Sequence, residues 1–227
     1  MVWVTMQKHL PALLSAIVGD AFGAGGWLMG NLAGAGFAAV AHGLLQQRMK
    51  RAHDTLLIEM RRGERTLDDP EMDQIVAVLL RYGRAAQEGT ARLNLRLMAK
   101  VIAGQVERRC LYADEFLRYA DLLAGLRREE IILLGTVHRH WHAAEVQSLE
   151  HGRRQQAARD RARSELVPVP FQEDGDFYAA AEAVTRTALL RTADAVEDNY
   201  ILFQPTRLLD ELCDMASFEA AVRDEPT

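Results

Sequence analysis

The chain has 227 residues, of which 49% are hydrophobic, and its formal net charge is −5. That length suits one large or two small domains, and the apolar share is too low for a protein with many membrane spans. Residues 110–227 carry 13 Lys and Arg against 22 Asp and Glu. This acidic excess argues against a general nucleic-acid-binding surface, because phosphate binding needs clustered cations.

The chain begins with a glycine-rich segment, residues 1–47, in which residues 21–47 contain no Asp, Glu, Lys or Arg. A helix needs about 20 apolar residues to cross a bilayer, so this uncharged run is long enough to span one. Alanine and glycine dominate the run, which makes its hydrophobicity moderate. We interpret the segment as a membrane-competent helix or hairpin. A buried, glycine-rich helix in a soluble core is the alternative.

Glycines recur four residues apart in this segment. On a helix such residues lie on one face, and glycines there let the backbone of a second helix approach closely. In water each of them would cost about 1 kcal/mol relative to alanine. The spacing therefore predicts a helix-packing face and a homo-oligomer. The predicted packing residues are Gly19, Gly23, Gly26, Gly30, Asn31 and Gly34.

Three cations, Arg48, Lys50 and Arg51, follow the uncharged run. Because positive charge favours the cytoplasmic side of a membrane, they predict an inner-membrane protein with a cytoplasmic C-terminal domain. A cytoplasmic protein is the alternative. The two cysteines, Cys110 and Cys213, form no CxxC motif and are typical of a reducing compartment.

Residues 48–110 are predicted to form a helical connector. The first helix continues from the uncharged run to about Gly63, and Asp69 and Pro70 are good starting residues for the second. A third helix begins near Thr90. The predicted buried positions of the second and third helices are Ile75, Val78, Leu79, Tyr82, Leu93, Leu97, Ile102 and Val106. We interpret the basic stripe of Arg92, Arg96 and Lys100 as a solvated face.

Residues 111–227 predict a domain with three helices, at 114–124, 128–164 and 176–190, before a short β ribbon and a final helix. The ribbon would pair residues 191–192 with 200–202, and the last helix would restart at Pro205. This order resembles a winged-helix module. In that family the helix before the ribbon is usually basic, whereas here it offers only Arg186 and one Glu, which favours a protein contact over DNA reading. The predicted fold class is therefore mainly α.

Two stretches, NLRLMAKVIAG at 94–104 and FLRYADLLAGLRREEIILL at 116–134, resemble the abortive-infection alpha-type proteins of bacteria. The resemblance covers about residues 90–217. It implies a role in defence against phage, in a protein that combines a region rich in small residues with helical segments and a terminal strand and helix.

The sequence HRHWH places His138 and His142 four residues apart on a predicted helix, with Glu145 on the same side. Such spacing can hold a metal ion, but the internal Glu of HExxH is absent. We favour surface and half-buried histidines, and predict no metal and no cofactor. Neither a nucleophile elbow nor a P-loop is present, so the sequence predicts a protein without enzymatic activity.

These observations favour a non-enzymatic, membrane-associated oligomer, in its sharpest form a permeabilising phage-defence effector. Its domain at 111–227 would bind a protein partner. A soluble helical adaptor or regulator is the first alternative. A winged-helix regulator that binds nucleic acid is the second, and the acidic domain disfavours it.

Overall fold

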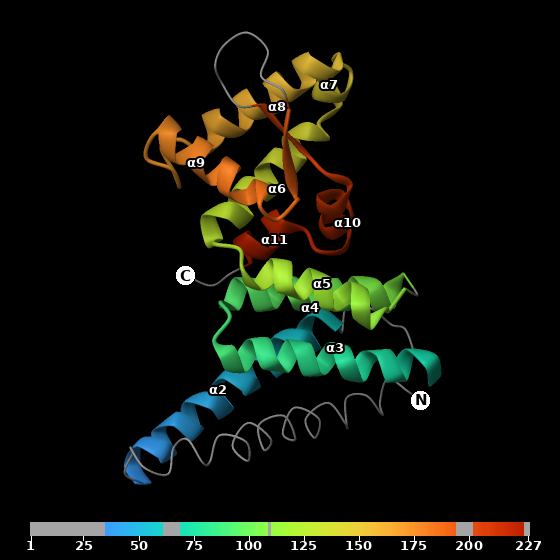
Figure 1. Cartoon of the computed structure of the whole chain (residues 1–227), viewed down its shortest axis with the longest axis vertical. Helices are drawn as coiled ribbons and strands as arrows, with labels where there is room; N and C mark the ends of the chain where they lie inside the picture. Colours follow the sequence, from blue (N-terminus) through green and yellow to red (C-terminus); the bar gives the residue numbers. More distant parts are fainter. Residues whose placement is uncertain (1–34, 61–68, 109, 194–201, 225–227) are drawn as a thin grey trace. The chain divides into compact units, whose positions relative to one another are not determined.

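A computed structural model describes residues 35–60, 69–108, 110–193 and 202–224 (Figure 1). Within these ranges the chain is helical apart from one two-stranded antiparallel sheet near the C-terminus, which confirms the mainly α prediction. The chain divides into unit 1, which ends at Ala124, and unit 2, which starts at Gly125. The predicted packing residues Gly19, Gly23, Gly26, Gly30, Asn31 and Gly34 lie outside the described residues.

Unit 1 contains helices α2 (Ala35–Met60), α3 (Asp69–Glu88), α4 (Arg92–Glu107) and α5 (Ala113–Ala124). Helix α4 packs against the other three, and α3 also contacts α2 and α5. Helix α5 therefore belongs to unit 1, whereas the sequence predicted that the C-terminal domain begins at residue 111. The core includes Met49, Leu56, Ile75, Val78, Leu79, Tyr82, Leu97, Ile102, Phe116 and Leu123.

Helix α3 begins at Asp69, as predicted, and ends in a Schellman motif. The backbone N–H of Gly89 donates to the carbonyl of Ala86, and that of Thr90 donates to the carbonyl of Ala85. Gly89 has φ of +89°, a conformation that glycine adopts without a steric cost. This turn ends α3 and lets the chain fold back into α4.

The basic stripe on α4 is not a solvated face, which corrects the sequence prediction. Arg96 Nε lies 3.7 Å and Lys100 Nζ 3.6 Å from the carboxylate of Glu59 on α2. Glu59 is only 3% exposed, and a buried carboxylate needs opposite charges close to it. Of the three basic residues, only Arg92 is exposed. The stripe therefore joins α4 to α2.

Unit 2 is built around helix α6 (Arg128–Trp141). The other elements are α7 (Ala144–Gln147), α8 (His151–Leu166), α9 (Asp174–Thr185), β1 (Leu190–Ala193), β2 (Leu202–Pro205), α10 (Arg207–Met215) and α11 (Phe218–Arg223). Helix α6 contacts α8, α9, α10, α11 and β2. As predicted, helices precede a ribbon and a terminal helical part, but the first predicted helix is α5 of unit 1 and the second is divided into α6, α7 and α8.

The helix predicted for 128–164 is broken after Trp141. Val146 of α7 and Ala158 of α8 form a small buried cluster with Trp141. The guanidinium of Arg154 lies 4.0 Å from the centre of the Trp141 ring, and it also donates to the Trp141 carbonyl. These contacts turn the chain, so that α8 packs against α6 rather than extending it.

The ribbon has a different register from the predicted one. Arg191 pairs with Gln204, and Thr192 pairs with Phe203. Pro205 belongs to β2, and Thr206 caps α10 by accepting from the N–H of Leu209. The final helix is also divided, because Ser217 caps a separate helix, α11. Register depends on packing across the strands, which local sequence does not specify.

Candidate functional site

The predicted basic residues Arg48, Lys50 and Arg51 are all exposed on α2. This helix begins at Ala35, inside the uncharged run, and continues without a break to Met60. From residue 43 onwards the first buried side chain of α2 is Met49, whereas Leu44 is 55% exposed. One helix thus links the end of the uncharged run to the packed core of unit 1. Within the described ranges, no helix is long and apolar enough to cross a membrane.

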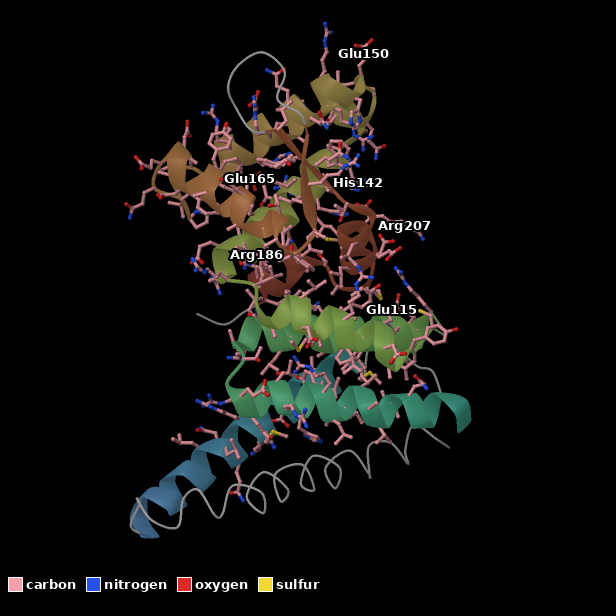
Figure 2. All side chains as sticks on the ribbon, in the orientation of Figure 1. Glu115, His142, Glu150, Glu165, Arg186 and Arg207 are labelled. Carbon is pink, nitrogen blue, oxygen red and sulfur yellow. The ribbon has the colours of Figure 1, made fainter. Side chains whose placement is uncertain are left out.

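His138 and His142 meet Asp210 of α10 at the C-terminal end of α6. Figure 2 labels His142. The Oδ1 atom of Asp210 lies 3.0 Å from Nε2 of His142 and 3.4 Å from Nε2 of His138. The two imidazole rings are 4.5 Å apart between their centres. These three side chains form the one group of potential metal ligands found among the described residues.

Glu145, which the sequence offered as a candidate third ligand while favouring no metal, is not part of this cluster. Its carboxylate is exposed and lies 3.2 Å from Arg161. The third group is instead Asp210, which follows His142 by 68 residues. Sequence reasoning missed it because Asp210 stands on another helix, and no local spacing relates it to the histidines.

Burial lowers the pKa of His138, and the nearby His142 lowers it further. The carboxylates of Asp210, Asp214 and Glu219 act in the opposite direction but do not outweigh burial. His138 is therefore held towards its neutral form, in which one ring nitrogen keeps a free lone pair.

The third histidine of HRHWH, His140, belongs to a different network. Its Nε2 lies 2.9 Å from Glu165 of α8. Arg139 donates to the same Glu165 and to Glu219 of α11. Since these bonds join α6 to α8 and α11, we interpret this network as structural.

The helix before the ribbon, α9, presents an acidic and alanine-rich face. Asp174, Asp176 and Glu182 are exposed, and so are Ala179 and Ala183. A face with this charge repels the phosphates of a nucleic acid. The small side chains leave the backbone accessible to a protein surface.

Arg186 is the one cation in the predicted helix 176–190, and it directly follows the last residue of α9 (Figure 2). It forms an ion pair within the chain. Its guanidinium makes two hydrogen bonds to the buried Glu130, at 2.7 Å and 3.1 Å. The carboxylate of Glu130 also accepts from the backbone N–H of Arg127, at the start of α6. Arg186 thus anchors the end of α9 to α6.

Both cysteines are free thiols. Burial raises the pKa of Cys213, and the carboxylates of Asp210, Asp214 and Glu219 raise it further. A thiol whose pKa is raised carries little thiolate, which is the nucleophilic form. Cys213 therefore lacks the electrostatic setting of an activated nucleophile.

Comparisons with protein-family profiles, with curated proteins and with solved structures returned no match for this chain.

Proposed function

We propose that the chain is a non-enzymatic, membrane-associated protein that forms homo-oligomers through its glycine-rich segment. It would reside in the inner membrane, with units 1 and 2 in the cytoplasm. The observation that carries this proposal is the continuity of α2, which leads from the uncharged run into the core of unit 1.

The cations on α2 support this proposal. Arg48, Lys50 and Arg51 are exposed where the uncharged run ends. Each basic residue close to an anionic membrane surface contributes about 1 kcal/mol to binding. Lys and Arg side chains can also keep their charged ends in water while their stems cover apolar surface. Together they would hold the end of the run at the lipid headgroups.

The first experiment is sedimentation of the full chain with vesicles that contain anionic lipids. The wild type should sediment with them, and less so with zwitterionic vesicles. The double variant Lys50→Glu/Arg51→Glu should bind the anionic vesicles several-fold less. A matched control, Arg92→Glu/Arg118→Glu, changes the charge equally at two exposed positions of α4 and α5. Recovery of the wild type entirely in the supernatant and in the soluble cell fraction would refute membrane association.

The second experiment tests the assembly. The spacing of Gly26, Gly30 and Gly34 supports close packing of two helices. Gly30→Leu should reduce the size of the oligomer measured by cross-linking in membranes. An oligomer of unchanged size would refute the glycine face as the assembly surface, whatever the vesicle result.

Phage defence is the biological role that we propose for such an oligomer, on the strength of the abortive-infection resemblance at 94–104 and 116–134. Expression of the chain in a bacterial host should then lower the plating efficiency of at least one phage in a panel. The variant Gly30→Leu should lose that protection. Equal plating with and without the chain across the panel would argue against this role.

A second candidate function is a helical adaptor, and the exposed face of α9 favours it. Asp176 and Glu182 would attract a basic protein surface, and Ala179 and Ala183 would allow close contact. Asp174 is paired with Arg163 at 2.6 Å. The other alternative, a regulator that binds nucleic acid, predicts binding to DNA rather than to a basic protein. Salt-sensitive DNA binding would support a nucleic-acid regulator, and absence of binding at low salt would exclude it.

A further inference from the structure

We propose that His138, His142 and Asp210 form a binding site for a divalent transition-metal ion, with zinc as the best fit. Each residue offers one ligand atom, and the three atoms all lie within 4.8 Å of one another. The site lies in unit 2 and is independent of the glycine-rich segment on which the proposed function rests.

The geometry is close to that of a bound zinc ion. Zinc binds histidine nitrogen at about 2.0–2.1 Å and carboxylate oxygen at about 2.0–2.2 Å. Ligand atoms around a tetrahedral ion are then a little more than 3 Å apart. Asp210 Oδ1 lies 3.0 Å from His142 Nε2 and 3.4 Å from His138 Nε2. The two histidine donors lie within 4.8 Å of each other, so the rings would have to turn towards each other to bring all three donors to one ion.

The charges around the cluster favour a cation. Asp210 supplies one negative charge, and Asp214 and Glu219 are close enough to influence His138. Both imidazoles face the same oxygen of Asp210, so a divalent ion placed between them could accept a lone pair from each ring and one from the carboxylate.

The donor set selects the kind of metal. Two imidazoles and one carboxylate suit zinc and its neighbours in the first transition row, whereas Mg²⁺ and Ca²⁺ prefer oxygen ligands. Cys213 stands on the same helix as Asp210, but burial raises the pKa of its thiol, so a thiolate ligand is disfavoured. The fourth coordination position is then left to water or to a donor from a partner.

The side-chain amide of Gln147 lies 3.4 Å from Nδ1 of His142. For Nε2 of His142 to bind a metal, Nδ1 must carry the proton and donate it, so the oxygen of the Gln147 amide, rather than its nitrogen, would have to face the ring. The ion would also join α6 to α10. Because the metal would bind the folded unit and not the unfolded chain, zinc should raise the melting temperature of unit 2.

The test uses the untagged full chain after removal of metals with a chelator. Zinc is titrated in competition with a chromogenic chelator, and the wild type should bind one ion per chain. His142→Gln should lower the affinity by more than about tenfold, because loss of a residue that only orients a metal ligand already costs about 10–100-fold, and Asp210→Asn should have a similar effect. The control is His140→Gln, which changes the same residue type two positions earlier on α6 and should leave the affinity unchanged.

Absence of binding in the wild type would overturn the proposal. Equal losses in His140→Gln and His142→Gln would also overturn it, because they would show adventitious binding to surface histidines. A second measurement, which uses only the wild type, keeps the test decisive if the variants fail to fold. On addition of zinc, the imidazole NMR signals of His138 and His142 should shift, while those of His53 should not. Shifts of equal size at His53 would refute the site.

Discussion

The guanidinium of Arg186 and the carboxylate of Glu130 form a two-bond ion pair between the C-terminal end of α9 and the first turn of α6. Glu130 is almost fully buried, while about half of the Arg186 side chain is exposed. In a winged-helix module that reads DNA, a cation at this place would face the nucleic acid. Here it serves the packing of unit 2.

Arg186→Ala should therefore destabilise unit 2. The change leaves a buried carboxylate with fewer partners, and a hydrogen bond to a charged group contributes about 1.5–3 kcal/mol. We expect a loss of about 1–2 kcal/mol in the free energy of unfolding, since exposure of the arginine weakens the pair. Urea unfolding measures the change. The control Arg207→Ala removes an exposed cation whose pair with Glu211 spans one helical turn, and it should cost less than about 0.5 kcal/mol.

The effect of Arg186→Ala should depend on pH. Burial raises the pKa of Glu130, but the hydrogen bonds from Arg186 and from the Arg127 backbone outweigh it and lower the pKa below its ordinary value of 4.5. A carboxyl group whose pKa is lower in the folded state stabilises the fold above the unfolded pKa, and this contribution disappears as pH falls through the folded pKa. The difference between wild type and variant should be largest near neutral pH and shrink below about pH 4. A difference that grows on acidification would contradict this assignment.

Glu59→Gln should destabilise unit 1. The neutral amide keeps the shape of the side chain but leaves Arg96 and Lys100, both largely buried, without their common counter-charge. Breaking a buried ion pair from one side costs about 3–5 kcal/mol, and partial exposure of the two cations should reduce the loss to about 1–3 kcal/mol. Thermal unfolding followed by circular dichroism measures it. Glu107→Gln, at an exposed position on α4, is the control and should be nearly neutral.

Gly135→Ala should destabilise unit 2, although alanine is the better helix former. A Cβ atom at Gly135 would lie 3.0 Å from Cγ of Glu219 and 3.3 Å from its backbone nitrogen. Helix α11 must then move away from α6, and such overpacking costs about 1–3 kcal/mol. Gly152→Ala is the matched control, because a Cβ there would meet nothing within 4 Å. It should stabilise the protein by up to about 1 kcal/mol. Equal effects of the two substitutions would refute the close approach of α11.

Ala188→Gly should stabilise the protein, whereas the same substitution at an exposed position of α9 should destabilise it. Ala188 has φ of 58°, and the left-handed conformation costs a non-glycine residue about 1–2 kcal/mol. The greater freedom of glycine in the unfolded chain offsets part of the gain, so we expect a net stabilisation of about 0.5 kcal/mol. Ala179→Gly, on the exposed face of α9, should instead destabilise by about 1 kcal/mol. Chemical denaturation of both variants tests the contrast.

The pattern of buried positions in α3 and α4 could be predicted from the sequence. Ile75, Val78, Leu79 and Tyr82 recur at helical spacing, and all four are buried. Amphipathic periodicity is local, because each turn of a helix turns the same face towards the core. The start of α3 at Asp69 could also be predicted, because the start of a helix depends on a few adjacent residues.

The position of one helix relative to another could not be read in this way. Arg96 and Lys100 have the same polar appearance as Arg92 in the sequence, and only the crossing of α2 over α4 places Glu59 beside two of them. The break after Trp141 likewise depends on Val146 and on α8. A charged residue at helical spacing is exposed or buried according to which helix packs on it.

The proposed metal site depends both on local helical spacing and on the packing of distant helices. The spacing of His138 and His142, four residues apart on a helix, already indicated that both rings share a face. The candidate third donor in the sequence was the neighbouring Glu145, in a reading that favoured no metal, whereas the fold places Asp210 of α10 beside the two histidines. The sequence by itself determined the mainly α class, the start of α3 and the apolar positions that α3 and α4 bury, because backbone hydrogen bonding and periodicity act over a few residues. Only the tertiary structure decided the ion pairs, the strand register and the third ligand, because those depend on which distant segments the shared core brings together.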